Sequence, residues 1–220
     1  MMEFKWIEKY YQDKKLGEYN LKNINFKVND GEFVKINRPS GNSRSDLMYL
    51  FGSLNNESSN EYVFFYNSTI EDKVNLIPEL NNPHVGLILK RNYLPDKLTV
   101  YENIETPLVE QNVRILARKK RVNKVLKEFN LFSEKDFHPN QLSKYKQQMV
   151  SIARAVVGNP KLIIADDPCA SLDRIKSNKL IEIMTKLNNE GITILLATSS
   201  SKPVTMNGKV INKKREITIN

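Results

Sequence analysis

The sequence predicts an α/β fold built around a mostly parallel β-sheet. A short, continuously apolar run at residues 162–165 is typical of a strand buried on both faces, and residues 192–198 predict a second strand of this kind. Segments with helical periodicity lie before and between these runs. Strands that alternate with helices favour a parallel sheet. The 220 residues suffice for one full core, and we expect a single domain over residues 1–220.

The first half of the chain is expected to contain strands and one loop of chemical interest. The strand candidates are residues 4–11, 21–28, 32–37, 61–66 and 85–90. A turn at residues 29–32 leads into the third of them. That strand runs into a loop of small and polar residues at 38–43, and residues 44–54 are predicted to form a helix. Strand, small-residue loop and helix, in this order, are the layout of a phosphate-binding loop.

The pattern in the second half is mainly helical from residue 101 to residue 155. One apolar face is defined by residues at i, i+3, i+4 and i+7 spacing: Val122, Val125, Leu126 and Phe129. Pro139 separates this helix from the next, for which Ser143 is the expected N-cap. After the strand at 162–165, a further helix is expected over residues 175–189, and Gly191 ends it.

The net charge of +9, from 34 Lys and Arg against 25 Asp and Glu, admits nucleic acid or an anionic membrane surface as a partner. Because the basic residues are spread along the chain, background charge is the simpler interpretation, and a nucleic-acid partner is not expected. The basic run at residues 118–121 is likewise interpreted as the solvated face of an amphipathic helix, with nucleic-acid binding as the alternative.

The content of cysteine, of histidine and of apolar runs argues against a disulfide framework, a histidine metal site and a membrane span. Cys169 is the only cysteine, so no disulfide can form within the chain, a reducing cytosol is compatible, and inert packing is the expected role. His84 and His138 have no partner at metal-ligand spacing. No apolar stretch approaches the roughly 18 residues of a membrane span, so we expect any membrane role to come through a partner.

Four features occur in a fixed order: the loop at 38–45, a helix that begins at Leu142-Ser143, a strand that ends in Asp166-Asp167, and a strand that ends in Thr198-Ser199-Ser200. The segment from Gln141 to Asp173 contains further short motifs, which follow one another at fixed spacings. The series resembles the ATP-binding subunits of ABC transporters over most of the chain. The segment from Leu94 to Ile104 is similar to the branch that serves lipoprotein release, macrolide export and cell division.

The resemblance implies a P-loop NTPase-like, mostly parallel sheet core with an antiparallel β subdomain and a helical subdomain inserted at about residues 92–150. It implies ATP and Mg²⁺ as ligands. The partners it implies are a transmembrane permease subunit and, as homodimer or heterodimer, a second ABC ATPase. The implied location is cytoplasmic, peripheral on the inner face of the cell membrane through the permease.

The nucleotide-binding residues implied by the resemblance are Tyr11, Arg38, Pro39, Ser40, Gly41, Asn42, Ser43, Arg44, Ser45 and Asp46. Tyr11 stands where the family stacks an aromatic ring on adenine, although core or edge packing explains it equally well. Arg38 and Ser43 replace glycines that let backbone N–H groups curl around phosphate. Arg44 replaces the lysine that reaches the β- and γ-phosphates, and the two cations are not interchangeable at a tight site. Ser45 is retained as a Mg²⁺ ligand, together with Asp166.

The catalytic positions also depart from the family. Asp167 replaces the glutamate that polarises the attacking water, and Ser199 replaces a histidine that contacts the γ-phosphate. Lys90 replaces a glutamine that senses metal and water. The signature loop, whose glycines admit the partner's γ-phosphate to a helix N-terminus, is here Leu142, Ser143, Lys144, Tyr145 and Lys146.

In the family, each ATP is held by the phosphate-binding loop of one subunit and the signature loop of the other. Because this chain departs from the family in both loops, the resemblance predicts weak or no ATP hydrolysis with any dimer partner. Two alternatives stay open. An active but divergent ATPase is conceivable because Arg44, Ser45, Asp166 and Asp167 keep the required charges or ligands. A non-enzymatic basic binding protein, for instance for nucleic acid, would use the net charge of +9.

Overall fold

The computed structural model describes residues 2–5, 9–13, 17–21, 25–37, 84–89, 94–198, 205–206, 209–210 and 214–218. Side chains are described over 28–36, 84–89 and 94–198. The predicted helix at 44–54 and the predicted strand at 61–66 lie outside these residues.

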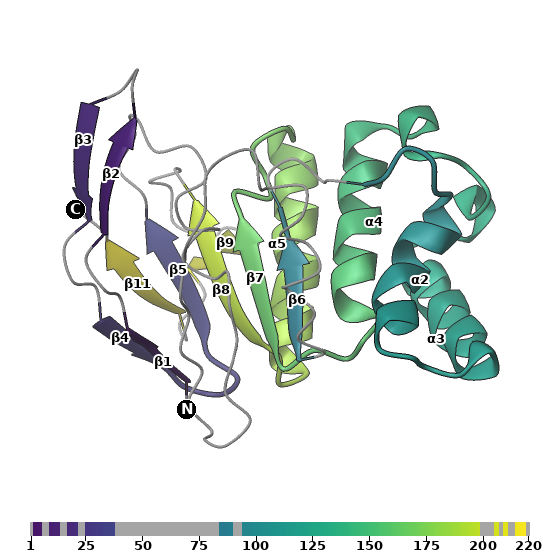
Figure 1. Cartoon of the computed structure of the whole chain (residues 1–220), viewed down its shortest axis with the longest axis horizontal. Coiled ribbons are helices and arrows are strands. Elements are labelled where there is room, and N and C mark those ends of the chain that lie inside the picture. Colours follow the sequence, from purple (N-terminus) through teal and green to yellow (C-terminus); the bar gives the residue numbers. More distant parts are fainter. Residues whose placement is uncertain are drawn as a thin grey trace.

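A five-stranded parallel sheet forms the centre of the fold, in the strand order β11-β5-β8-β7-β6 (Figure 1). Its strands are β5 (Phe33–Asn37), β6 (Val85–Ile88), β7 (Leu162–Asp166), β8 (Thr193–Thr198) and β11 (Lys214–Thr218). All four pairings in this sheet are parallel. The predicted α/β class is therefore confirmed. Every residue of β7 and β8 is buried, which explains why both strands are apolar nearly throughout.

Four described α-helices accompany this sheet. They are α2 (Val100–Glu110), α3 (Ile115–Glu128), α4 (Lys144–Val156) and α5 (Arg174–Asn189). Two short 3-10 turns, Phe132–Glu134 and Pro139–Gln141, connect α3 to α4. Helices α2 and α3 form one end of the molecule, and α4 separates them from the sheet (Figure 1). The predicted helical stretch thus consists of three α-helices. The proposed subdomain boundaries at about 92 and 150 stay a prediction.

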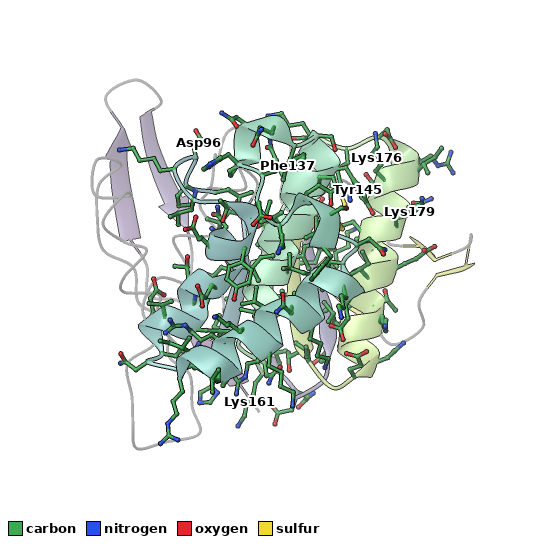
Figure 2. All side chains as sticks on the ribbon, turned by 90° about the vertical axis from the view of Figure 1, so that its right-hand side faces the viewer. Asp96, Phe137, Tyr145, Lys161, Lys176 and Lys179 are labelled. Carbon is green, nitrogen blue, oxygen red and sulfur yellow. The ribbon has the colours of Figure 1, made fainter. Side chains whose placement is uncertain are left out.

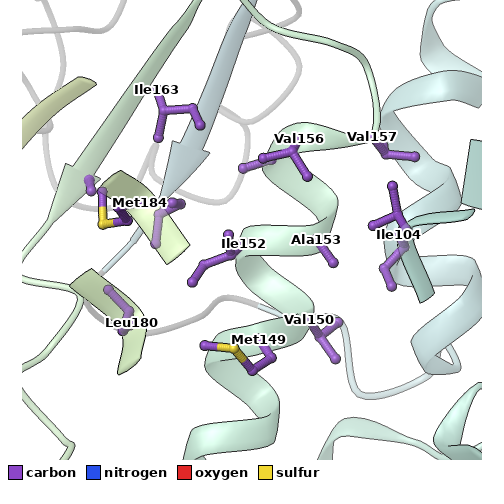
Figure 3. Close-up of a cluster of buried hydrophobic side chains, with 14 of the residues drawn as sticks. Ile104, Met149, Val150, Ile152, Ala153, Val156, Val157, Ile163, Leu180 and Met184 are labelled. Atoms are coloured by element: carbon purple, nitrogen blue, oxygen red, sulfur yellow. The ribbon is translucent and has the colours of Figure 1, made fainter. Parts of the chain in front are cut away.

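Helix α4 is buried on two sides, and this holds the helical end to the sheet. Figure 3 shows Met149 and Ile152 pointing toward α5, whereas Val150 and Ala153 point toward Ile104 of α2. The helix also approaches β6 closely: a Cβ atom built on Gly86 would lie 2.4 Å from the backbone oxygen of Ala155. Only glycine permits this separation, so Gly86 fixes how near α4 comes to the sheet.

Helix starts follow local capping chemistry. Thr99 begins α2 with a capping box, in which its hydroxyl accepts from the Glu102 backbone N–H and the Glu102 carboxylate accepts from the Thr99 N–H. Ser143 caps α4, as predicted, and Asp173 caps α5 through the Lys176 backbone N–H at 2.9 Å. The predicted start of α5 at residue 175 is one residue late.

Three antiparallel pairs lie outside the central sheet: β1 (Met2–Lys5) with β4 (Asn25–Val28), β2 (Lys9–Asp13) with β3 (Gly17–Leu21), and β9 (Thr205–Met206) with β10 (Lys209–Val210). The predictions of single strands at 4–11 and 21–28 are wrong, because each range is divided between strands that pair with different partners. Within the described residues, no helix is long and apolar enough to cross a membrane.

Candidate functional site

The carboxyl ends of three neighbouring strands meet at one edge of the sheet. In the register, Asn37 at the end of β5 pairs with Thr198 at the end of β8, and Asp166 at the end of β7 pairs with Ala197. Arg38 follows β5 directly along the chain, and Ser199 follows β8. In open parallel sheets, ligands bind outside this edge. The topology therefore directs three of the sequence motifs to one side of the molecule.

Asp167 is held at this edge by hydrogen bonds of both its backbone and its side chain. Its backbone N–H donates to the Ala197 carbonyl at 2.8 Å, and its own carbonyl accepts from the Ala170 N–H at 3.0 Å. The Thr198 hydroxyl donates to Asp167 Oδ1 at 3.2 Å. The backbone of Asp167 has a φ of 42°, in the left-handed region. Aspartate and asparagine adopt this region more readily than other non-glycine residues, as Asn112, Asn130 and Asn159 also do in this chain.

Asp166 lies beside it as the last residue of β7, and both aspartates are buried, with exposed fractions of 3% and 6%. Within the described residues, no three His, Cys, Asp or Glu side chains are grouped as a complete metal site. One carboxylate fits Mg²⁺ nonetheless, because Mg²⁺ is commonly held by one or two carboxylates and completed by water and substrate phosphates. Asp166 is therefore suited to hold such an ion when nucleotide supplies the remaining oxygens.

The signature residues form the start of α4, at the same end of the molecule as the start of α5. Figure 2 places Tyr145 and Lys176 together at this end and Lys161, which precedes β7, at the opposite end. The Ser143 hydroxyl accepts from the Lys146 backbone N–H at 3.3 Å and so serves as the helix cap. Leu142 is buried, whereas Lys144 is exposed.

Lys146 contacts its own chain. Its ammonium donates to the Asn130 carbonyl at 2.7 Å and pairs with the Glu134 carboxylate at 3.1 Å. Glu134 is desolvated by burial, but the hydrogen bond from Lys146 and other hydrogen bonds outweigh this and lower its pKa. Tyr145 packs against the hydrophobic core, and burial raises the pKa of its phenol. Among Lys144, Tyr145 and Lys146, only Lys144 has an exposed side chain.

The remaining predicted site residues lie outside the described side chains. The backbone of Tyr11 belongs to β2, opposite Tyr19. The positions of Arg38, Pro39, Ser40, Gly41, Asn42, Ser43, Arg44, Ser45, Asp46, Lys90 and Ser199 are not described. Their assignments stay predictions.

Two contacts at the site were missed by the sequence analysis. The Thr198 hydroxyl donates to Asp167, which lies 31 residues away along the chain. Glu134, in the first of the two 3-10 turns that precede α4, forms an ion pair with Lys146. No local pattern marks either partner. Cys169 behaves as the sequence analysis expected: it is partly buried, and burial raises the pKa of its thiol to about 11.

A parallel sheet with adjacent aspartates at its carboxyl edge, beside the capped start of a signature-like helix, defines a nucleotide-binding domain. The ABC transporter family profile matches residues 21–170. The chain therefore belongs to the ABC transporter family of ATP-binding proteins.

Three curated relatives illustrate the range of this similarity. An uncharacterized ABC transporter ATP-binding protein of Bacillus subtilis, YvrO, is 32% identical over 90% of this chain and 86% of its own length. An uncharacterized ABC transporter ATP-binding protein of Methanocaldococcus jannaschii, MJ1508, is 33% identical over 96% of this chain and 94% of its length. The macrolide export ATP-binding/permease protein MacB of Haemophilus ducreyi is 35% identical over 90% of this chain, which spans 28% of that protein.

Solved structures agree with the family and the fold. The dimeric structure of MJ0796, an ABC transporter cassette, aligns with a TM-score of 0.69 and 32% identity over 88% of this chain and 86% of its own. A post-hydrolysis dimer of the same cassette, bound to ADP and Pi, aligns with the same TM-score at 30% identity over the same shares of the two chains. The relatives with macrolide export in their names match the branch that the sequence indicated.

Proposed function

We propose that this chain is a nucleotide-binding transporter subunit in which ATP hydrolysis is weak or absent, and which docks on a transmembrane permease subunit at the inner face of the membrane. We further propose that it pairs with a second ABC ATPase, either another copy or a different subunit. One observation carries the proposal: the scaffold of the site is retained, while the groups that act on the γ-phosphate are changed. The family membership and the dimeric structural neighbours support the assembly.

The environment of Asp167 supports impaired chemistry. An aspartate is one methylene shorter than the glutamate of the family, and a displacement of about 1 Å can cost roughly 10²-fold in rate. The Thr198 hydroxyl at the end of β8 donates to Asp167 Oδ1. The backbone N–H and the backbone carbonyl of Asp167 both form hydrogen bonds as well. A carboxylate held in this way has little freedom to move outward and recover the missing length.

The signature end supports the same conclusion. The charge of Lys146 is directed into the chain by Glu134 and the Asn130 carbonyl. Its ammonium is therefore engaged and contributes little toward a phosphate bound by a partner subunit. Of Lys144, Tyr145 and Lys146, Lys144 alone has an exposed side chain, and a flexible surface ammonium is a poor substitute for a preorganised backbone donor.

When bound, ATP would bring its own phosphates and Mg²⁺. Asp166, with Ser45, would hold the metal, and the residues at 38–45 would surround the phosphates. Each departure from glycine there restricts the backbone, since glycine adopts conformations that other residues resist. The proposal therefore predicts weak Mg²⁺–ATP binding as well as slow turnover.

Steady-state hydrolysis by the chain with its permease, and Mg²⁺–ATP binding by calorimetry on the chain alone, test the proposal. We expect turnover near background, and an increase on combining Arg44→Lys, Asp167→Glu and Ser199→His. Asp136→Glu, the same one-methylene extension on a carboxylate that is 81% exposed, is the matched control for Asp167→Glu. Robust hydrolysis by the unchanged protein would refute the proposal.

The alternative of an active, divergent ATPase rests on the retained carboxylates Asp166 and Asp167. It predicts measurable turnover that Asp167→Asn abolishes. Turnover that is indifferent to this change would exclude the alternative and point to a contaminating enzyme.

A further inference from the structure

We propose that helix α3 carries a contact surface for anionic membrane lipid, separate from any contact with a permease. The surface consists of Leu116, Lys119, Lys120, Lys124 and Lys127, and we call it the basic face of α3. All five residues are exposed. The proposal concerns the isolated chain and does not depend on the state of the nucleotide site.

Charge is concentrated in this helix. Its 14 residues contain six Lys or Arg and one Glu, so its net charge is +5, against +9 for the whole chain. The sequence-based interpretation that basic residues are merely spread along the chain is therefore incomplete. The buried residues Val122, Val125 and Leu126 anchor the opposite side of the helix. Helix α3 lies at one end of the molecule, on the far side of α4 from the sheet (Figure 1).

Part of this charge is available for an external partner. Arg118 is engaged within the chain, because it pairs with Glu105 at 2.9 Å and donates to the Val113 carbonyl. Among the described residues, Lys119 and Lys120 make no ion pair. Lys124 pairs with Glu128 at 3.6 Å, and exposed pairs of this kind on a helix contribute little.

Apolar side chains lie at both ends of the basic face. Leu116, at its start, is 82% exposed, and Ile115 beside it is 60% exposed. Phe132, just beyond its end, is 43% exposed. Leu116 and Lys127 are about 16 Å apart along the axis, at a rise of about 1.5 Å per residue. Lysines between exposed Leu and Phe side chains suit a lipid interface, where the apolar groups enter the acyl boundary and the ammoniums contact headgroups.

The same features argue against nucleic acid as the partner. A phosphate backbone attracts the lysines but gains nothing from an exposed leucine.

Vesicle sedimentation of the full chain tests the proposal. We expect binding to phosphatidylcholine vesicles that contain about one third phosphatidylglycerol, and much weaker binding to pure phosphatidylcholine. Raising the ionic strength to about 0.5 M should release the protein, because screening shortens the range of the attraction. Equal binding to neutral and anionic vesicles would overturn the proposal.

Charge reversal locates the surface. A basic residue near an anionic surface contributes about fivefold to partitioning, so Lys119→Glu with Lys120→Glu should reduce binding at least about 25-fold. The matched control is Lys179→Glu with Lys186→Glu on α5, which makes the same change in net charge at exposed positions elsewhere. We expect vesicle binding by the control variant to fall by less than about threefold, because its two reversed charges lie away from the basic face of α3. Equal losses in the two pairs would refute the location.

A third variant separates lipid from nucleic acid. Leu116→Ser should weaken vesicle binding about fivefold, since it removes an apolar anchor and leaves every charge in place. Unchanged vesicle binding, combined with tighter binding to a single-stranded oligonucleotide at equal phosphate concentration, would assign the surface to nucleic acid and overturn the proposal. Thermal unfolding followed by circular dichroism confirms that each variant is folded.

Discussion

The hydrogen bond between Thr198 and Asp167 predicts that replacing Thr198 with valine destabilises the fold and loosens the Asp167 side chain. The hydroxyl donates to Asp167 Oδ1 at 3.2 Å. Both residues are buried, with exposed fractions of 8% and 6%. Valine keeps the shape of threonine and suits a strand, so the change removes the hydroxyl donor and keeps the β-branched side chain.

The magnitude follows from the geometry. Hydrogen bonds to charged groups contribute about 1.5–3 kcal/mol to stability. A distance of 3.2 Å is long for a hydroxyl that donates to a carboxylate, which favours about 2.5–2.7 Å. We therefore expect the lower limit, a loss of about 1.5 kcal/mol in the free energy of unfolding.

Thr185→Val is the matched control. Thr185 is also buried, but its hydroxyl donates to the Ile181 carbonyl within α5 at 2.8 Å. Such a bond to residue i−4 supports a helix little. We expect Thr185→Val to change the free energy of unfolding by less than about 0.5 kcal/mol.

Urea unfolding of a double-mutant cycle measures the interaction. The cycle compares the unchanged protein, Thr198→Val, Asp167→Ala and the double variant. We expect a coupling energy of about 1 kcal/mol, because alanine removes the acceptor of this hydrogen bond. A coupling near zero, or equal losses in Thr198→Val and the control, would show that the hydroxyl does not hold Asp167.

Three further outcomes follow from the described contacts. Gly86→Ala should destabilise the fold by about 2–3 kcal/mol in urea unfolding, because the new methyl group meets the backbone oxygen of Ala155 at 2.4 Å; Gly158→Ala, which meets only a flexible side chain, should cost much less. Cys169 should react with iodoacetamide at least about 100-fold more slowly in the folded protein than in urea at pH 8, since a thiol with its pKa raised to about 11 holds little thiolate; similar rates would contradict this burial. Thr99→Ala should lower stability by about 1 kcal/mol through loss of the capping box, as thermal unfolding would show, whereas Thr99→Ser should retain most of it.

The sequence by itself determined the α/β class, the parallel sheet and the family. Continuous apolar runs predicted β7 and β8, and Ser143 was identified as a cap from its type and place alone. These features are local: burial on both faces of a strand and the free N–H groups of a helix start impose residue types within a few positions. The order of the motifs along the chain identified the class of nucleotide-binding proteins.

Only the tertiary structure decided which distant residues meet. It joined β11, which the sequence analysis did not identify, to β5, and thereby placed Lys35 in the sheet interior, with an exposed fraction of 1%. It brought Thr198 to Asp167 and turned Lys146 toward Glu134. Such contacts depend on strand register and on how α4 packs, and neither leaves a periodic signal in the chain. The sequence therefore predicted where the residues of interest lie along the chain, whereas the packing determined how the side chains of Asp167 and Lys146 are held.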